Sequence, residues 1–321
     1  MNILITSVGR RNKLVKYFKN HFKKVIVTDA SEYAPAIYEA DKYYITPKID
    51  SPNYIEVVKE ICKREQVTGI LSLIDPELHK LSSYKEEFSK IGVTIIGSDE
   101  EISELCFDKW KMYEFLKKNN FKTPKTYKSI ETFKEDYKNK KIFFPVFIKP
   151  VTGSASIGIN KIDNMSTLEL TLKLSKGEML IQEFMNGQEI GADVYIDLLN
   201  KEVISIFTKE KLSMRAGETD KAKSFKDNEL FNIITNFIKL LGVIGPVDLD
   251  IFKVNDEYYI SEVNPRFGGG YLIAYECGEK FPEFIKNNLE NKVNSKKIGL
   301  YEENMIMLKC DDLKIIHKNK E

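Results

Sequence analysis

Hydrophobic residues in the first hundred positions alternate between short unbroken runs and helical spacing. The runs are rich in β-branched residues, as buried strands are: "NILITSV" (2–8), "KVIVTDA" (24–30), "GILSLID" (69–75) and "IGVTIIGS" (91–98). Between them, segments such as "RRNKLVKYFKNHF" (10–22) place apolar residues on one face of a helix. Strands that alternate with amphipathic helices predict a parallel sheet with helices on both faces.

The pattern changes near residue 103. The segment "EISELCFDKWKMYEFLKKNN" (101–120) predicts one helix that begins near Asp99 and is broken at Pro124. Strand-forming runs then predominate, beginning with "FFPVFIKPV" (143–151) and "GEMLIQEFM" (177–185). Two antiparallel pairs follow: 188–199 with 203–212, joined at Asn200 and Lys201, and 245–254 with 257–263, which turn at "NDE". A helix over 230–242 separates these pairs, and "KIIHKNKE" (314–321) predicts a last strand with a frayed tail.

Composition narrows the class of protein. Hydrophobic residues make up 42% of the 321 residues and charged residues 30%, which indicates a folded globular chain and not a disordered one. The net charge of +1 argues against a broad nucleic-acid surface, while leaving room for a local basic patch. We expect no membrane span and a cytoplasmic location, because the apolar runs are short and the four cysteines are scattered. None of the three histidines adjoins a nucleophile motif, so the chemistry is expected not to use a histidine base.

Candidate ligand contacts lie where the early strands end. Ligands bind at the carboxyl edge of such sheets, where Gly9, Asp29, Asp75 and Glu77 fall. Gly9, Arg10, Asp75 and Glu77 are the substrate candidates here. The stretch "SVGRRNK" carries one glycine, which argues against a dinucleotide fingerprint. Asp29, at the end of the second run, fits a helix cap as well as a ligand contact, whereas ligand contact is favoured for "DPE" (75–77).

The segment "ISEVNPRFGGG" (260–270) carries the strongest chemical signal. Alternation along a strand places Glu262, Asn264 and Arg266 on one face, and Asp248 and Asp250 share a face of the preceding strand. If the two strands pair in register, their oxygen atoms converge, as Mg²⁺ requires when it shares a nucleotide phosphate. The alternative is an exposed strand face with cross-strand charge pairs.

Two further segments suit a nucleotide. Lys149 ends a strand ahead of a small-residue loop, where backbone N–H groups and an ammonium suit phosphate: Gly153, Ser154, Ala155, Ser156 and Gly158. The loop lacks the G-K-[ST] ending of a Walker A motif, and an ordinary flexible turn is the alternative. In "IQEFMNGQEIGADV" (181–194), a strand end beside Phe184 could hold a purine, and the Glu189 carboxylate could bind ribose.

Taken together and in this order, these motifs resemble the ATP-grasp superfamily, in particular carboxylate–amine ligases similar to the large subunit of carbamoyl-phosphate synthetase. The series is "DK" (108–109), "FIKP" with its loop, "QEF" and "GQE", "DLD", and "SEVNPR". The resemblance implies a mixed α/β and α+β fold. A Rossmann-like pre-ATP-grasp domain would cover 1–103, and an ATP-grasp domain 104–297 with lobes of about 104–184 and 185–297. A C-terminal strand and tail would follow at 298–321.

The resemblance also implies roles. Lys109 and Lys149 would contact ATP phosphates, with the loop from Gly153 to Gly158 folded over them. Glu183, Phe184 and Met185 would frame adenine, and Glu189 would bind ribose. Asp250, Glu262 and Asn264 would hold Mg²⁺, with Mn²⁺ as a substitute, and Arg266 would clamp the reacting phosphate. Gly268, Gly269 and Gly270 would let a substrate approach the backbone. Asp250 departs from the glutamine that this branch often carries, and a carboxylate should bind Mg²⁺ at least as well.

The segment "KEKLSMRAGETDKA" (209–222) resembles a loop that reaches the active site in single-module relatives. Lys211, Arg215 and Glu218 are its candidates, with a solvated charge run as the alternative. Arg215 is preferred as a catalytic residue because a guanidinium grips a carboxylate through two hydrogen bonds.

The implied activity is an ADP-forming ligase that acts on a small-molecule carboxylate and an amine through an acyl phosphate. Two alternatives stay open: a single-module enzyme that uses bicarbonate, and a non-catalytic ATP-binding regulator. The chain has one module and no glutamine-hydrolysing unit, which argues against synthesis of carbamoyl phosphate. A homodimer is also left open.

Overall fold

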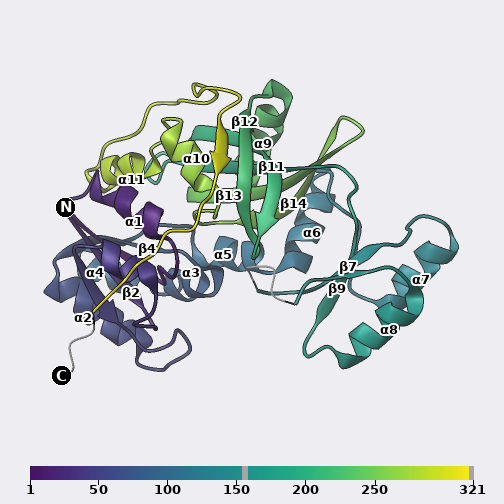
Figure 1. The fold of residues 1–321 in the computed structure, drawn as a ribbon, viewed down its shortest axis with the longest axis horizontal. Coiled ribbons are helices and arrows are strands. Elements are labelled where there is room, and N and C mark those ends of the chain that lie inside the picture. Colours follow the sequence, from purple (N-terminus) through teal and green to yellow (C-terminus); the bar gives the residue numbers. More distant parts are fainter. Residues whose placement is uncertain (154–157, 318–321) are drawn as a thin grey trace.

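The computed structural model describes residues 1–153 and 158–317, and its amino-terminal part is the predicted parallel sheet. The strands lie in the order β3-β2-β1-β4-β5, as in doubly wound folds. This part of the chain lies at the left of Figure 1, in purple and blue. Their bounds are Asn2–Thr6 (β1), Lys24–Asp29 (β2), Lys42–Ile45 (β3), Val67–Ser72 (β4) and Thr94–Ile95 (β5). The helices are Asn12–Lys19 (α1), Tyr54–Arg64 (α2), Asp75–Ser82 (α3) and Lys85–Lys90 (α4), with a 3-10 turn at Pro35–Glu39 (η1).

Both faces of this sheet are buried. On β1, Ile3 and Ile5 pack into the cluster that contains Phe18 of α1, whereas Leu4 packs into the opposite cluster with Val58 of α2. Successive strand residues point to opposite faces, so an unbroken apolar run can serve two hydrophobic layers. The sequence prediction of helices on both faces is therefore confirmed.

The helix expected over 101–120 is two helices. Glu100–Phe107 (α5) ends at Asp108, and Lys109–Lys118 (α6) begins immediately after it. The Asp108 carboxylate accepts hydrogen bonds from the backbone N–H groups of Trp110 and Lys111, at 2.9 and 3.0 Å. An N-cap formed by Asp108 thus starts a new helix in the middle of an apolar pattern that continues through it.

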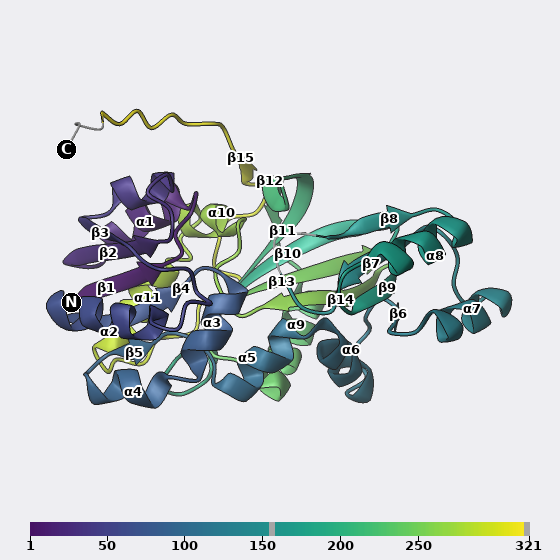
Figure 2. The ribbon, with the colours of Figure 1, turned by 90° about the horizontal axis from the view of Figure 1, so that it is seen from below.

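The small lobe is a four-stranded antiparallel sheet in the order β6-β9-β7-β8, and two helices cover it (Figure 2). Its strands are Thr126–Tyr127 (β6), Val146–Pro150 (β7), Asn160–Ile162 (β8) and Met179–Glu183 (β9). Its helices are Ile130–Lys138 (α7) and Met165–Leu174 (α8). Phe133 and Leu168 of these helices pack on Val146 and Ile148, so this lobe has a core of its own.

The large lobe is built on a six-stranded sheet in the order β14-β13-β10-β11-β12-β15. Its strands are Gln188–Ile196 (β10), Val203–Arg215 (β11), Glu218–Phe225 (β12), Gly245–Val254 (β13), Glu257–Asn264 (β14) and Ile306–Leu308 (β15). Helices Asn228–Leu241 (α9), Tyr271–Glu276 (α10) and Phe281–Leu289 (α11) pack against it. Both predicted hairpins are present, and residues in their turns have positive φ: Lys201, Asn255 and Asp256.

The last strand lies earlier than predicted. It is β15, which pairs with β12 through Lys221 and Leu308, whereas residues 314–317 form no strand and 318–321 lie outside the described part. The free edge of β12 offers backbone hydrogen bonds that the pattern of residues 314–317 does not reveal. Beyond β15 the chain runs across the amino-terminal domain (Figure 1), where Lys314 contacts Glu39. In the described residues, no helix has the length and apolar character needed to cross a membrane.

Candidate active site

A cavity lies where the amino-terminal domain, the small lobe and the large sheet meet. The amino-terminal domain lines it with Arg11 and Ile74, and the small lobe contributes Lys149 and Thr152. Most of the other lining residues come from the large lobe, among them Lys211, Glu218, Asp248, Asp250, Glu262, Asn264, Arg266 and Gly269. Residues far apart in the sequence therefore converge on one polar site.

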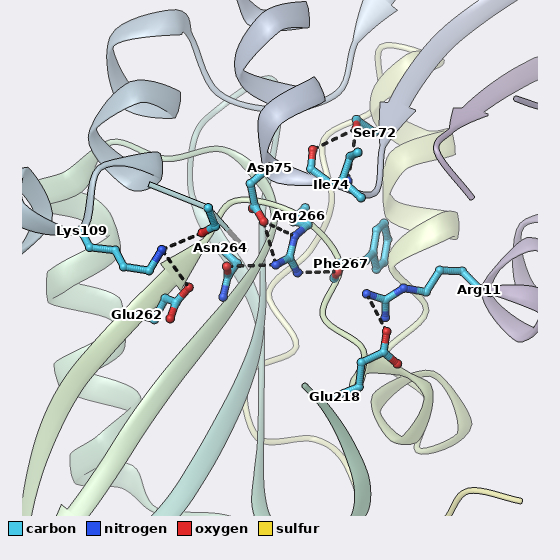
Figure 3. A network of polar contacts seen from close by, with 11 residues as sticks. Arg11, Ser72, Ile74, Asp75, Lys109, Glu218, Glu262, Asn264, Arg266 and Phe267 are labelled. Atoms are coloured by element: carbon cyan, nitrogen blue, oxygen red, sulfur yellow. Dashed lines mark hydrogen bonds and ion pairs between the residues drawn. The ribbon is translucent and has the colours of Figure 1, made fainter. Parts of the chain in front are cut away.

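The β13–β14 hairpin presents the predicted oxygen atoms in register. Asp250 pairs directly with Glu262, and Asp248 pairs with Asn264. Arg266 lies just past the end of β14 and donates from Nη2 to Asn264 Oδ1 at 3.0 Å (Figure 3). The structure thus brings together the carboxylates, carboxamide and guanidinium that strand alternation predicted.

Two lysines face this hairpin. Lys149, at the end of β7, is buried, and this burial lowers its pKa to about 8, although Glu262 opposes the shift. Lys109 Nζ lies 3.9 Å from Glu262 Oε1 and donates to the Gly153 carbonyl at 2.6 Å. The ammonium groups of Lys149 and Lys109 therefore lie opposite the carboxylates, and the cavity has room for a ligand that contacts both.

Gly153 opens the small-residue loop with a φ of +123°, a conformation that favours glycine. The predicted phosphate contacts at Ser154, Ala155 and Ser156 lie outside the described residues.

Glu183 accepts a hydrogen bond from the Lys125 backbone N–H, and Phe184 packs on Phe147. These two side chains and Met185 belong to the edge of the small lobe and do not line the cavity. A smaller adjoining cavity shares Lys109 and Glu262 with the first. Its other walls mix apolar residues with polar ones: Met112, Leu116 and Val263 with Gln182 and Ser261.

Lys211 is buried between two carboxylates. Its Nζ lies 2.9 Å from Glu189 Oε1 and also contacts Asp250. Burial alone would lower the pKa of Lys211, but the charges of Asp250 and Glu189 raise it above its usual value. The predicted ribose ligand Glu189 is therefore tied to the metal-ligand candidate Asp250 through one ammonium.

Arg215 does not enter the cavity. It ends β11 at the tip of a hairpin, is 62% exposed, and binds both carboxylate oxygens of Asp311 at 3.1 and 3.2 Å. Arg215 thus makes the expected bidentate contact, but with Asp311 of the C-terminal segment and not with a substrate. Glu218, three residues later, does line the cavity, because β12 turns back toward it.

In the amino-terminal domain the cavity is reached by Arg11 and not by Arg10, which is exposed. Arg11 Nη2 lies 3.2 Å from Glu218 Oε1 (Figure 3). Gly9 has a φ of +48° and donates its backbone N–H to Asp29, so this carboxylate fixes the loop. The sequence offered two adjacent arginines, and only the fold decides which of them points inward.

The two carboxylates of "DPE" have separate roles. Asp75 binds Arg266 at 3.0 Å from Nε and 2.9 Å from Nη2, and so positions the guanidinium (Figure 3). Glu77 is buried inside the domain, where Thr6 Oγ1, at 2.6 Å, and the hydroxyls of Ser72 and Tyr54 donate to it. Burial raises the pKa of Glu77. The expectation of a ligand contact at Glu77 is therefore wrong, since its oxygens are used to join β1, β4 and α2.

Replacement of Glu77 with alanine should lower the free energy of unfolding by roughly 2–3 kcal/mol, because three buried hydroxyls lose their acceptor. Urea unfolding measures this, with Glu60→Ala on the exposed face of α2 as control. The KM values of the folded variant should stay unchanged. A stable Glu77→Ala protein with a raised KM would instead return Glu77 to the substrate site.

The three glycines after Arg266 make room for the protein's own charged groups. A side-chain carbon on Gly268 would lie 2.4 Å from the Asp248 carboxyl group. One on Gly269 would lie 2.9 Å from both Arg11 Nη1 and Glu218 Cδ. The missing side chains thus make room for Asp248, Arg11 and Glu218, while Gly269 still lines the cavity.

The donor set fits a cation that also binds phosphate. In the described residues, no three or more histidine, cysteine, aspartate or glutamate side chains group into a complete metal site. Asp250 and Glu262 supply two facing carboxylates, and Asn264 supplies a carboxamide next to them. Mg²⁺ normally takes only one or two carboxylates and completes its sphere with water and phosphate, so these residues suit it.

Two family models match successive parts of the chain. Residues 3–96 match the model described as the PylC-like N-terminal domain, and residues 106–270 match the ATP-grasp domain model. The second match covers more than half of the chain.

Individual relatives are more distant. The carbamoyl phosphate synthase large chain of Campylobacter jejuni is 23% identical over 232 residues, which are 67% of this chain and 21% of that protein. The tyramine–L-glutamate ligase of Methanocaldococcus fervens is 27% identical over 227 residues, 68% of this chain and 66% of the ligase. The chain spans between a fifth and a quarter of the carbamoyl phosphate synthase large chains it matches.

Among solved structures, the biotin carboxylase domain of the 2-oxoglutarate carboxylase of Hydrogenobacter thermophilus, crystallised with MgADP and bicarbonate, has a TM-score of 0.74. It is 15% identical, and the match covers 95% of this chain and 73% of that one. A likeness at this identity shows a shared fold.

Proposed function

The chain belongs to the ATP-grasp family, and from that premise we propose that it is an ADP-forming ligase that joins a carboxylate to an amine. The observation that carries the proposal is the pairing of Asp250 with Glu262 opposite Lys149 and Lys109. Carboxylates for a cation and ammonium groups for phosphates face one another across one cavity. That arrangement suits a nucleoside triphosphate with a bound metal ion.

Asp250, Glu262 and Asn264 would hold Mg²⁺, or Mn²⁺ as a substitute, and the ion would neutralise the charge of the transferring phosphate. Lys149 and Lys109 would bind the phosphates of ATP. Adenine would lie toward the small lobe, at Glu183 to Met185. The smaller cavity beside Lys109 is bordered by Gln182, the residue that precedes this segment.

The remaining residues position the substrates. Arg266, held by Asp75 and Asn264, would bind the carboxylate that receives the γ-phosphoryl group. The products of that step would be ADP and an acyl phosphate, which the amine then attacks with release of phosphate. The protein contributes alignment and charge stabilisation, which need no histidine base. We also propose small-molecule substrates, a cytoplasmic location and a homodimer.

A bicarbonate-dependent reaction is the second candidate, favoured by the similarity to carbamoyl phosphate synthase large chains. It would use the same phosphate site with bicarbonate as the carboxylate. The two candidate reactions therefore differ in the compound that receives the phosphoryl group, and both use ATP.

ADP release over a panel of carboxylates and amines, single and paired, with Mg²⁺ and ATP, tests the proposal. A ligase releases ADP with a matched pair and almost none with ATP alone. ADP release that needs bicarbonate would favour the second candidate. ATP binding without ADP release under any pair would contradict both and indicate a nucleotide-binding regulator.

A further inference from the structure

Lys211 contacts the same carboxylate that is proposed to bind the metal ion. Its Nζ contacts Asp250 Oδ1 and lies 2.9 Å from Glu189 Oε1, and only 5% of the lysine side chain is exposed. Asp250 is also the residue that pairs with Glu262 across the β13–β14 hairpin. An ammonium group and a divalent cation repel each other strongly when both approach one carboxylate. Lys211 and a metal ion are therefore competitors for Asp250.

The sheet is built so that Lys211 can reach Asp250. Lys211 lies on β11 and Asp250 on β13, and β10 runs between these two strands. The residue of β10 that pairs with Asp250 is Gly191, and a side-chain carbon there would lie 3.3 Å from Lys211 Cε. The missing side chain of Gly191 thus gives the lysine a path across β10.

The neighbouring lysine shows how a fixed ion pair differs from an exchangeable one. Lys209 also passes close to Gly191, and it binds Asp193 where both side chains are almost completely buried. Neither Lys209 nor Asp193 lines the cavity. Lys211 and Asp250 both line it, and 27% of the Asp250 side chain is exposed. A ligand in the cavity can therefore reach the contact between Lys211 and Asp250 and replace one of the partners.

The charges around the hairpin balance without a metal ion. Three ammonium groups and three carboxylates face one another there: Lys211, Lys149 and Lys109, with Glu189, Asp250 and Glu262. A divalent cation alone would add uncompensated positive charge to a site with little solvent, where unbalanced charge is costly. ATP carries more negative charge than a divalent cation carries positive charge. A cation that arrives with ATP therefore brings an anion for the ammonium groups as well.

We propose that Lys211 is an internal counter-ion that holds Asp250 until a nucleotide binds, so that the protein takes up Mg²⁺ together with ATP and disfavours Mg²⁺ alone. The inference rests on the ligase function proposed above. Lys211 exchanges Asp250 for the phosphates, and Asp250 is then free to act as a metal ligand. The same exchange releases Glu189, the candidate ligand of the ribose. Nucleotide and metal ion each strengthen binding of the other, because both depend on the exchange at Lys211.

Titration with Mn²⁺, followed by the electron paramagnetic resonance signal of the free ion, tests the inference without turnover. Lys211→Met removes the charge and keeps most of the side-chain volume. Without nucleotide, this variant should bind Mn²⁺ about 10- to 100-fold more tightly than the wild-type protein, because the competing ammonium group is gone. With a non-hydrolysable ATP analogue present, the variant should bind Mn²⁺ no more tightly than the wild-type protein, since Lys211 has then left Asp250 in both.

Two further variants show whether the gain acts through Asp250. Lys211→Met combined with Asp250→Asn should lose the gain, because the released carboxylate is missing. Lys253→Met is the matched control, since Lys253 lies on the same strand as Asp250 but pairs with Asp256 at the exposed turn of the hairpin. It should bind Mn²⁺ as the wild-type protein does. If Lys211→Met does not fold, Lys211→Gln takes its place, because its amide still donates hydrogen bonds to the carboxylates and carries no charge.

An unchanged or weaker affinity of the Lys211 variants for free Mn²⁺ would overturn the inference and leave Lys211 as a structural brace. So would a wild-type protein that binds free Mn²⁺ as tightly as it binds Mn²⁺ with the analogue. Failure of the ligase function gives a different result, in which no substrate pair releases ADP while the gain in Mn²⁺ affinity persists and supports the exchange at Lys211. A wild-type protein that binds neither Mn²⁺ nor the analogue would overturn both proposals.

Discussion

Glu262→Gln is expected to reduce kcat by at least about 100-fold, because an amide cannot replace the negative charge that a divalent cation requires. Glu262 faces Asp250 across the β13–β14 hairpin and lies 3.9 Å from Lys109. Asn264→Ala should cause a similar loss, since it removes the carboxamide oxygen, which is also the acceptor of Arg266 Nη2. The measurement is ADP release over a range of Mg²⁺ concentrations, where the Mg²⁺ requirement should also rise.

The matched control is Glu257→Gln. Glu257 begins the same strand at its exposed end and pairs with Lys122 at the surface, so its loss should leave kcat near the wild-type value. Circular dichroism and urea unfolding should show that all three variants are folded. Retention by Glu262→Gln of more than about a tenth of wild-type turnover at saturating Mg²⁺ would rule out its role as a metal ligand.

Lys149→Ala is expected to weaken ATP binding by about 10- to 150-fold, the equivalent of about 1.5–3 kcal/mol for a charge-assisted hydrogen bond. The ammonium group is buried at the cavity beside Glu262, so water cannot easily replace a phosphate oxygen as its hydrogen-bond partner. Calorimetric titration with MgATP measures the change. Lys149→Met, which keeps most of the side-chain volume, should behave similarly, whereas Lys128→Ala at the surface should not.

The same lysine predicts a pH dependence. Burial lowers the pKa of Lys149 to about 8, and phosphate should raise it again in the complex. ATP affinity should therefore be highest below pH 8 and fall by about tenfold per unit above it, with uptake of a proton on binding. Lys149→Ala should lose this dependence. An affinity that is flat between pH 7 and 9 in the wild-type protein would remove Lys149 from the phosphate site.

Local patterns in the sequence were sufficient for most of the fold. Four of the five strands of the parallel sheet, both hairpins and helix α9 follow from runs and periodicities that each act over a few residues. The break at Asp108 was missed because apolar spacing continues through it, and the helix boundary depends on one carboxylate that caps the next helix. The last strand was misplaced because residues 306–308 pair with the free edge of β12. Which segment pairs there depends on contacts between parts of the chain that are distant in sequence.

The chemistry of the site divides in the same way. The sequence by itself determined that Glu262 and Asn264 share a face and that Asp250 can lie opposite, because strand alternation and a short turn fix those relations. Only the tertiary structure decided that Arg11 and not Arg10 reaches the cavity, that Glu77 is buried in the domain, and that Arg215 binds the C-terminal segment. Each of those outcomes depends on which distant element packs against the side chain, and no periodicity along the chain records that.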